Sequence, residues 1–301
     1  MSSDLLVNSS AMTALLALNQ TQQSLNTYEN QVSTGLAISG AKDNAAYWSI
    51  ATSMSSQVDS LNAVSSALSE SAALLSTMNT ALQQTVTVVN NIKTDLQTAS
   101  NLVNEGDTAD LAKTQSDINS QIQSLLSLGQ STNVNGVNFL MASSGATVNL
   151  LASYNPTSGA QFITIDTGST TALFNTASTA ATTGILGSSG AASGLSVLNF
   201  NVTGASAGAI ANMLTDIGSV LNSVTSAGSV VGAAQNNVTE QQNFISNLTD
   251  SLTSAVGSLV DADMNQASTK ISALQVQQQL GVQALSIANS NTQLILKLFG
   301  L

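Results

Sequence analysis

The sequence predicts a mainly α-helical protein: an elongated antiparallel coiled-coil or helical-bundle rod with a small β-hairpin region and an exposed central insertion. The first observation is that apolar residues recur at every seventh position through two long segments. Such a stripe is buried when one helix supercoils against another. The second is that aromatic residues make up only 3% of the chain, so aliphatic side chains must supply the apolar surface. The third is a change of period from seven to two near the centre, which indicates strands.

The two seven-residue series are predicted to form one seam, the rod seam. The first comprises Met54, Leu61, Leu68, Leu75, Leu82, Val89 and Leu96, and the second comprises Ile217, Val224, Val231, Val238, Ile245, Leu252 and Leu259. We predict one long helix over about residues 43–104 and a return helix over about residues 207–261. Because each would otherwise leave its stripe exposed, we expect the two helices to pair within one chain.

The two ends of the chain are predicted to be apolar helices that need a cover. The first helix covers residues 3–35 and stops at Gly35, and the last covers about residues 265–298. Residues 294–301 are apolar on nearly every side, and an exposed patch of that kind is an association site. The assembly residues predicted from these helices are Leu15, Leu18, Leu25, Val32, Ile271, Leu274, Leu285, Ile295 and Phe299.

Between these helices the chain is expected to be less regular. A turn-rich joint covers residues 33–46, a loop covers 105–108, and a shorter amphipathic helix runs to Gly129. Residues 133–166 form the β-region, with turns at Asn135-Gly136 and around Pro156, and the Ser/Thr/Gly-rich residues 167–194 are exposed. We therefore divide the chain into a terminal domain (1–42 and 264–301), a rod domain (43–166 and 205–263) and a short, variable, surface-exposed insertion (167–204).

The composition argues against several classes of function. The net charge is −11 and the chain has no arginine, which disfavours nucleic acid and anionic membranes as partners. It also lacks Cys and His, so thiol or imidazole catalysis and Cys or His metal sites are excluded. Asp261 and Asp263 are interpreted as acids at a joint between helices, because side chains two apart on a helix point to different faces. We predict no catalytic, cofactor or metal site, no signal peptide and no membrane span.

Three separated motifs resemble the signature of bacterial flagellins. Residues 33–46 read STGLAISGAKDNAA, residues 231–237 read VGAAQNN, and residues 260–263 read VDAD, with QQQLG following at 277–281. The resemblance covers roughly residues 1–150 and 205–301. It implies a structural protein, exported through the flagellar type III apparatus without a cleaved signal, that polymerises into the extracellular flagellar filament for swimming motility. It also implies hook-junction and cap proteins as partners and a cytoplasmic export chaperone at the C-terminus.

The sequence also leaves alternatives to this interpretation open. The nearest is the flagellin-related hook-filament junction protein, which shares both termini. A helical bundle that assembles with nothing would leave residues 294–301 uncovered, and an exported glycosidase or peptidase would need convergent Asp and Glu carboxylates.

The chain departs from the family pattern at two positions. Many flagellins carry arginine where this chain has Lys93 and Asn237. Because that segment of related proteins is read by an innate immune receptor, we predict weak receptor recognition.

Overall fold

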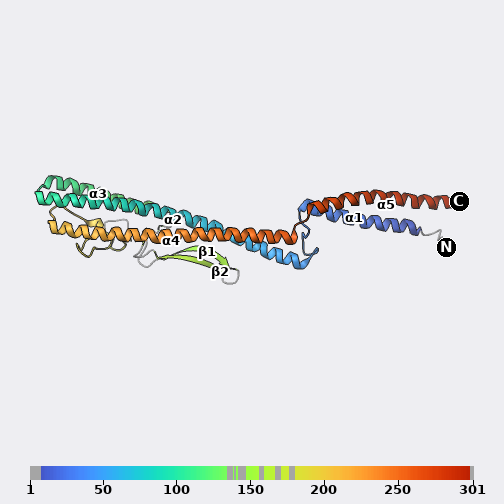
Figure 1. The fold of residues 1–301 in the computed structure, drawn as a ribbon, viewed down its shortest axis with the longest axis horizontal. Helices are drawn as coiled ribbons and strands as arrows, with labels where there is room; N and C mark the ends of the chain where they lie inside the picture. The colour runs from blue at the N-terminus through green and yellow to red at the C-terminus, as the bar shows by residue number, and fades with distance from the viewer. Residues whose placement is uncertain are drawn as a thin grey trace. The chain divides into compact units, whose positions relative to one another are not determined.

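The computed structural model describes residues 8–133, 138, 140–141, 147–155, 159–166, 171–175 and 180–298. Its elements are α1 (Ser9–Thr34), α2 (Ala45–Glu105), α3 (Thr108–Ser131), β1 (Thr147–Asn155), β2 (Gly159–Asp166), the 3-10 helix η1 (Val197–Asn199), α4 (Ala207–Val260) and α5 (Met264–Leu298) (Figure 1). The prediction of a mainly α-helical chain with a small β-hairpin is confirmed. The two long helices, α2 and α4, contain 61 and 54 residues.

The chain forms two compact units. Unit 1 contains Met1–Asp59 and Asp250–Leu301, and unit 2 contains Ser60–Thr249. The sequence analysis placed its boundaries at turns, near residues 42 and 264, whereas the units meet inside α2 and α4. A helix makes its backbone hydrogen bonds locally, so it can pass from one packed region into the next without a break.

The ends of α1 are determined by side chains that the sequence shows. Asn8 precedes the helix, and its side-chain oxygen accepts a hydrogen bond from the Ala11 N–H over 2.9 Å. At the other end Gly35 adopts a left-handed conformation, φ 74°, and its N–H donates to the Gln31 carbonyl over 2.8 Å. Glycine adopts this conformation without a steric penalty, which makes Gly35 the predicted stop.

The core of unit 2 follows the seven-residue period. Leu61, Leu68, Leu75, Leu82, Val89 and Leu96 of α2 are all buried, and so are Ile217, Val224, Val231, Val238 and Ile245 of α4. The Gln242 side-chain amide of α4 donates to Ser69 Oγ of α2 over 3.3 Å, so within unit 2 these helices lie together. Helix α3 lies on α2, where the Gln121 side-chain amide donates to Asp95 Oδ2 over 2.7 Å (Figure 1). The remaining members of the seam, Met54, Leu252 and Leu259, belong to unit 1 and are only half-buried.

The small sheet is an antiparallel hairpin. Strands β1 and β2 pair from Thr147 opposite Asp166 to Asn155 opposite Gly159, with an irregularity between Leu151 and Ser153. The expected turns at Asn135-Gly136 and Pro156 lie outside the described residues.

The central insertion is not simply an exposed excursion, and that expectation is wrong for much of it. Residues 171–174 are buried, and Phe174 lies so close to Gly129 of α3 that an added Cβ there would overlap its ring. The Gln115 side chain of α3 bonds twice to the segment, donating to the Phe200 carbonyl over 3.2 Å and accepting from the Val202 N–H over 2.6 Å. The apolar residues responsible follow no regular period, so the surrounding Ser, Thr and Gly dominated the prediction.

Helix α4 is long and apolar enough in composition to cross a membrane, although the sequence analysis expected no such segment. This is weak evidence for a span, because the core helix of a soluble protein meets the same criterion. In unit 2 the apolar residues of α4 are buried at the seven-residue spacing, with Ser, Thr, Asn and Gln between them.

Candidate assembly interface

Helices α1 and α5 pack against each other in an antiparallel pair. The Gln278 side-chain amide donates to Gln22 Oε1 over 2.6 Å, and the Asn8 side-chain amide donates to the Ala288 carbonyl over 3.0 Å. Earlier residues of α1 therefore meet later residues of α5. Both bonds use amide groups, in keeping with a chain in which only 7% of residues are charged.

The side of each helix that faces its partner follows alternating steps of three and four residues. Its members are Ala11, Ala14, Leu18, Thr21, Leu25, Tyr28 and Val32 of α1 and Ala267, Ile271, Leu274, Gln278, Gly281, Leu285 and Ala288 of α5. Leu25 and Ala267 are buried, and the others are half-buried. The helices approach closely at Gly281, where an added Cβ would lie 3.3 Å from Leu18 Cδ1. This inner stripe is a narrow coiled-coil seam.

A second apolar stripe lies on the outer side of each helix and faces solvent. It comprises Met12, Leu15 and Leu16 of α1 and Val276, Leu280 and Ile287 of α5, which are 51% to 64% exposed. At about 100° per residue, the centre of each outer group lies about 120–150° around the helix from the inner stripe of the same helix. A helix with two separate apolar sides can pack against two neighbours, and among the described residues of unit 1 only the inner stripe has one.

The predicted assembly residues divide between these two stripes. Leu18, Leu25, Val32, Ile271, Leu274 and Leu285 belong to the inner stripe, and Leu15 belongs to the outer one. The Ile295 side chain and Phe299 lie outside the described residues. The sequence analysis missed the other five outer residues because it followed one heptad stripe per helix. The signal was present in α5, where Val276, Leu280 and Ile287 are four and seven residues apart.

The two connections that follow α1 and precede α5 are hydrogen-bonded to each other. The Ala37 and Ile38 N–H groups both donate to the Val260 carbonyl, over 2.7 and 3.2 Å, and the Ala262 N–H donates to the Gly35 carbonyl over 2.8 Å. These bonds hold the base of the helix pair. Residues 33–38 and 260–263, which carry two of the recognised motifs, therefore meet in space.

Of the two acidic residues of this joint, Asp263 caps a helix. Asp263 accepts from the Asn265 and Gln266 N–H groups at the start of α5, over 3.0 and 3.1 Å. Among the described residues no group of three or more Asp or Glu side chains is arranged to hold a metal ion. The positions of Asp261 and Asp263 agree with their interpretation as joint residues.

Asp43 closes the turn before α2. Its carboxylate accepts from the Ser39 N–H and Ser39 Oγ, both over 3.0 Å, and from the Gly40 N–H over 3.2 Å. The hydrogen bonds from Ser39, with that from Gly40 and the charge of Lys42, hold the pKa of Asp43 below its usual value. Asp43, Lys42 and polar residues of α1 also line an open cleft of about 290 Å³.

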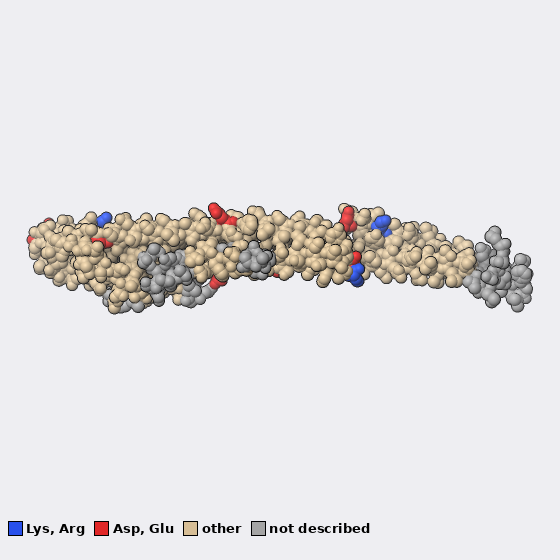
Figure 2. Space-filling model, turned by 90° about the horizontal axis from the view of Figure 1, so that it is seen from below, with Lys and Arg blue, Asp and Glu red and all other residues tan. Residues whose placement is uncertain are grey.

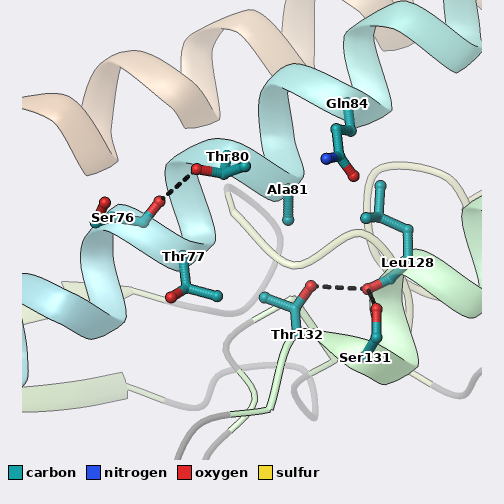
Figure 3. A pocket seen from close by; sticks show the side chains of 8 residues that line it. All are labelled: Ser76, Thr77, Thr80, Ala81, Gln84, Leu128, Ser131 and Thr132. Atoms are coloured by element: carbon teal, nitrogen blue, oxygen red, sulfur yellow. Dashed lines mark hydrogen bonds between the residues drawn. The ribbon is translucent and has the colours of Figure 1, made fainter.

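A second cleft, of about 290 Å³, lies between α2 and α3 (Figure 3). Its lining residues are Ser76, Thr77, Thr80, Ala81, Gln84, Leu128, Ser131 and Thr132. Thr80 Oγ1 donates to the Ser76 carbonyl over 3.0 Å, and Thr132 Oγ1 donates to the Leu128 carbonyl over 2.7 Å. Four of the lining hydroxyls, those of Thr77, Thr80, Ser131 and Thr132, are bonded to backbone carbonyls, and the lining residues include no acid or base, so this lining offers no catalytic arrangement.

Charged side chains are sparse where the outer stripe lies. Figure 2 shows a face on which Lys, Asp and Glu are few and scattered. On α1, Glu29 is the only charged residue among residues 9–34, and on α5 Lys270 is the only one among residues 264–290. Few hydrated ions would have to be displaced if another surface covered these helices.

Comparison with known proteins supports the same interpretation. A model of the bacterial flagellin N-terminal helical region matches residues 6–144, and one of the flagellin C-terminal helical region matches residues 214–299. The chain is 38% identical to a flagellin of Brucella melitensis biotype 1 over 297 residues, covering 98% of each chain. It is 32% identical to flagellin C of Rhizobium meliloti over 98% of each chain, and 30% identical to flagellin FljO of Caulobacter vibrioides over 97% of each.

Proposed function

Because the chain belongs to the bacterial flagellin family and is a subunit of the flagellar filament, we propose that the α1–α5 pair is the surface by which it joins its neighbours. The observation that carries this proposal is the outer apolar stripe, which unit 1 leaves uncovered. Full burial of a Leu or Ile side chain contributes about 1.5–3 kcal/mol, so burial of the exposed half contributes about 1 kcal/mol for each.

The outer stripe suits an open polymer. Its α1 and α5 parts differ in sequence, so two copies can meet through different surfaces, as in head-to-tail association. Such contacts generate a helical filament when the rotation does not close. Residues 1–42 and 264–301 would then make the filament core, as the family resemblance implies.

The partners and location follow from the same proposal. A subunit of the flagellar filament works outside the cell, so the chain must be exported, and an apolar α5 would require a cytoplasmic chaperone before export. Hook-junction and cap proteins would meet the same helices at the ends of the filament. The relatives compared above are flagellins over nearly their whole length, which favours the filament subunit over a hook-filament junction protein.

Weak innate immune recognition also remains a proposal. Lys93 is half-buried on α2 and Asn237 is exposed on α4, and neither offers the planar, five-donor guanidinium of arginine. A receptor-reporter assay on purified monomer should therefore give a weak response, and a full-strength response would overturn this part of the proposal.

Electron microscopy of the purified full-length chain after salt-induced assembly tests the main proposal. The wild-type chain should form filaments, whereas Leu285→Asp should not, because a charge would enter the inner stripe at a cost of several kcal/mol. Phe162→Asp, at a position 55% exposed on β2, is the control and should still assemble. Filaments of normal length from Leu285→Asp would contradict the assignment of α1 and α5 as the interface.

A further inference from the structure

Asp216 of α4 is a buried acid in a part of the chain that otherwise lacks charge. Only 4% of its surface is exposed, and it is the only charged residue among residues 167–239. Burial of a carboxylate costs free energy unless hydrogen bonds or an ion pair compensate for the lost hydration. A charge placed at such a position therefore indicates a specific partner for Asp216.

The partner is a short loop of the central insertion, residues 190–195. The Ala192 N–H donates to Asp216 Oδ1 over 3.0 Å, and the Ser193 N–H donates to Asp216 Oδ2 over 2.7 Å, so both carboxylate oxygens are bound. Gly190 lies so close to the carboxylate that an added Cβ would overlap it. The loop thus forms a fitted cradle for this one side chain.

The segment that contains the loop is attached a second time, to α3. We call residues 190–202 the strap. The Gln115 side chain of α3 bonds the Phe200 carbonyl and the Val202 N–H, and Leu198, between the two attachments, is buried. An amide does not titrate, whereas a carboxylate does. Of the two attachments, only the one on α4 can therefore respond to pH.

The cradle binds the charged form of Asp216. Burial alone would raise the pKa of Asp216, but hydrogen bonds from the Ser193 side chain and from the Ala192 and Ser193 N–H groups outweigh it and hold the pKa below its usual value of 3.8. A group with a lowered pKa in the folded state stabilises that state above the usual pKa. This contribution is lost as the pH falls through the folded pKa.

No charge on the neighbouring elements contributes to this binding. The strap carries no charged residue, and the two lysines of unit 2, Lys93 on α2 and Lys113 on α3, are not among the causes of the lowered pKa. The same holds for the other acids of unit 2, which are Glu70, Asp95, Glu105, Asp107, Asp110, Asp117, Asp166 and Glu240. The carboxylate of Asp216 is therefore held by hydrogen bonds from the strap.

We propose that the strap is an acid-sensitive clasp, in which protonation of Asp216 releases residues 190–195 from α4 while Gln115 keeps the other end of the strap on α3. A neutral carboxyl group accepts weaker hydrogen bonds than a carboxylate does, so the closed cradle loses two charge-assisted bonds. The clasp is closed at a pH above 3.8 and opens as the pH falls below that value. It lies within unit 2 and does not depend on how the chain assembles.

Hydrogen exchange of the full-length monomer tests the clasp, with each rate divided by the intrinsic rate of the same amide at the same pH. In peptides covering residues 190–195, protection should fall about tenfold or more between about pH 6 and about pH 2.5, because hydrogen bonds to a charged acceptor are lost. Peptides of α3 should stay protected. If residues 190–195 kept their protection until circular dichroism showed loss of helix, the inference would be overturned.

Two variants should open the clasp at every pH by different means. Asp216→Asn replaces one acceptor oxygen with an NH₂ donor that faces an N–H of the loop, and Gly190→Ala keeps the charge but overlaps the carboxylate. In both, the loop should exchange near pH 6 as fast as the wild-type loop does near pH 2.5. Glu240→Gln removes an exposed carboxylate from the same helix and should behave as wild type.

The variants also give the result that would contradict the clasp. If folded Asp216→Asn kept the wild-type protection near pH 6 and lost it in acid, another group would be the switch and the inference would fail. Circular dichroism shows whether each variant is folded. If Asp216→Asn does not fold, Gly190→Ala and the wild-type titration decide the question.

Discussion

Units 1 and 2 use the same heptad pattern and reach different degrees of burial. Of the 42 buried apolar residues in the described parts of the chain, 38 lie in unit 2 and four in unit 1. The large exposed apolar residues show the reverse, with four in unit 2 and 11 in unit 1. An apolar stripe is therefore not in itself a core, since it becomes one only when enough neighbours surround the helix.

The number of packed elements explains this difference. In unit 2, α3 and residues 171–175 and 180–202 add to the pairing of α2 with α4. Leu68, Leu75 and Val231 are completely buried there. In unit 1 the helix pair α1 and α5 buries only its inner stripe. Unit 2 can be stable as a monomer, whereas unit 1 needs neighbouring subunits to bury its remaining apolar surface.

The largest expected effect would come from a charge on the outer stripe. Leu280→Asp should raise the critical concentration for assembly more than a hundredfold, because a charge buried at a subunit contact costs several kcal/mol and each 1.4 kcal/mol is about tenfold. The monomer should unfold as wild type does, since Leu280 is 58% exposed there. Sedimentation of polymer at a series of protein concentrations measures the critical concentration. If Leu280→Asp assembled like wild type, the outer stripe would not be part of the subunit interface.

A truncation in the core of unit 2 should instead affect the monomer. Leu75→Ala should lower the free energy of unfolding by about 2–5 kcal/mol, because it leaves a cavity at a fully buried position. Leu16→Ala, at a position 59% exposed in unit 1, is the control and should change it by about 0.5 kcal/mol or less. Urea unfolding measures both values. If Leu75→Ala and Leu16→Ala lowered the free energy of unfolding equally, the proposed difference in packing between the two units would be wrong.

The packing of the central insertion on α3 can be tested at Gly129. Alanine in a helix is favoured over glycine by about 1 kcal/mol, but here its Cβ would overlap the buried Phe174 ring, and overpacking costs about 1–3 kcal/mol. We expect Gly129→Ala to lower the melting temperature. Gly218→Ala in α4, where nothing lies within 4 Å of an added Cβ, should raise it. A lower melting temperature for Gly129→Ala together with a higher one for Gly218→Ala would support the packing of Phe174 on α3. A higher melting temperature for Gly129→Ala would contradict it.

The smallest effect is expected at Asp95 in unit 2. Burial raises the pKa of Asp95, the negative charge of Asp117 raises it further, and the hydrogen bond from Gln121 opposes both. The raised pKa means that the folded state disfavours the charged carboxylate. The free energy of unfolding should therefore increase as the pH falls through the pKa that Asp95 has in the folded state. Asp95→Asn should therefore stabilise the chain by about 0.5 kcal/mol or less at pH 7.

The gain from Asp95→Asn should disappear near pH 3, where Asp95 itself is neutral. Urea unfolding at several pH values measures the trend. A gain that stayed constant with pH would show that the carboxylate charge is not its cause.

Much of the fold could be predicted from local signals. The series from Leu61 to Leu96 predicted a helix seam, and Gly35 and the residues 105–108 marked helix ends that the structure places at Thr34 and Glu105. The packing of residues 171–174 could not be predicted, because Phe174 is buried in contact with Gly129, which is far away in the chain. Part of the candidate interface was missed for a different reason, since the sequence analysis followed one heptad stripe per helix and named only Leu15 of the outer stripe.

The sequence by itself determined where the helices lie and which of their sides are apolar, because periodicity, caps and glycine stops act within a few residues of one another. Only the tertiary structure decided which of those sides are covered. Leu75 and Leu280 are both leucines on long helices, yet Leu75 is fully buried and Leu280 is 58% exposed. The physical reason is that burial depends on what packs against a helix face from elsewhere in the chain, and along most of their length α1 and α5 bury only the sides that face each other.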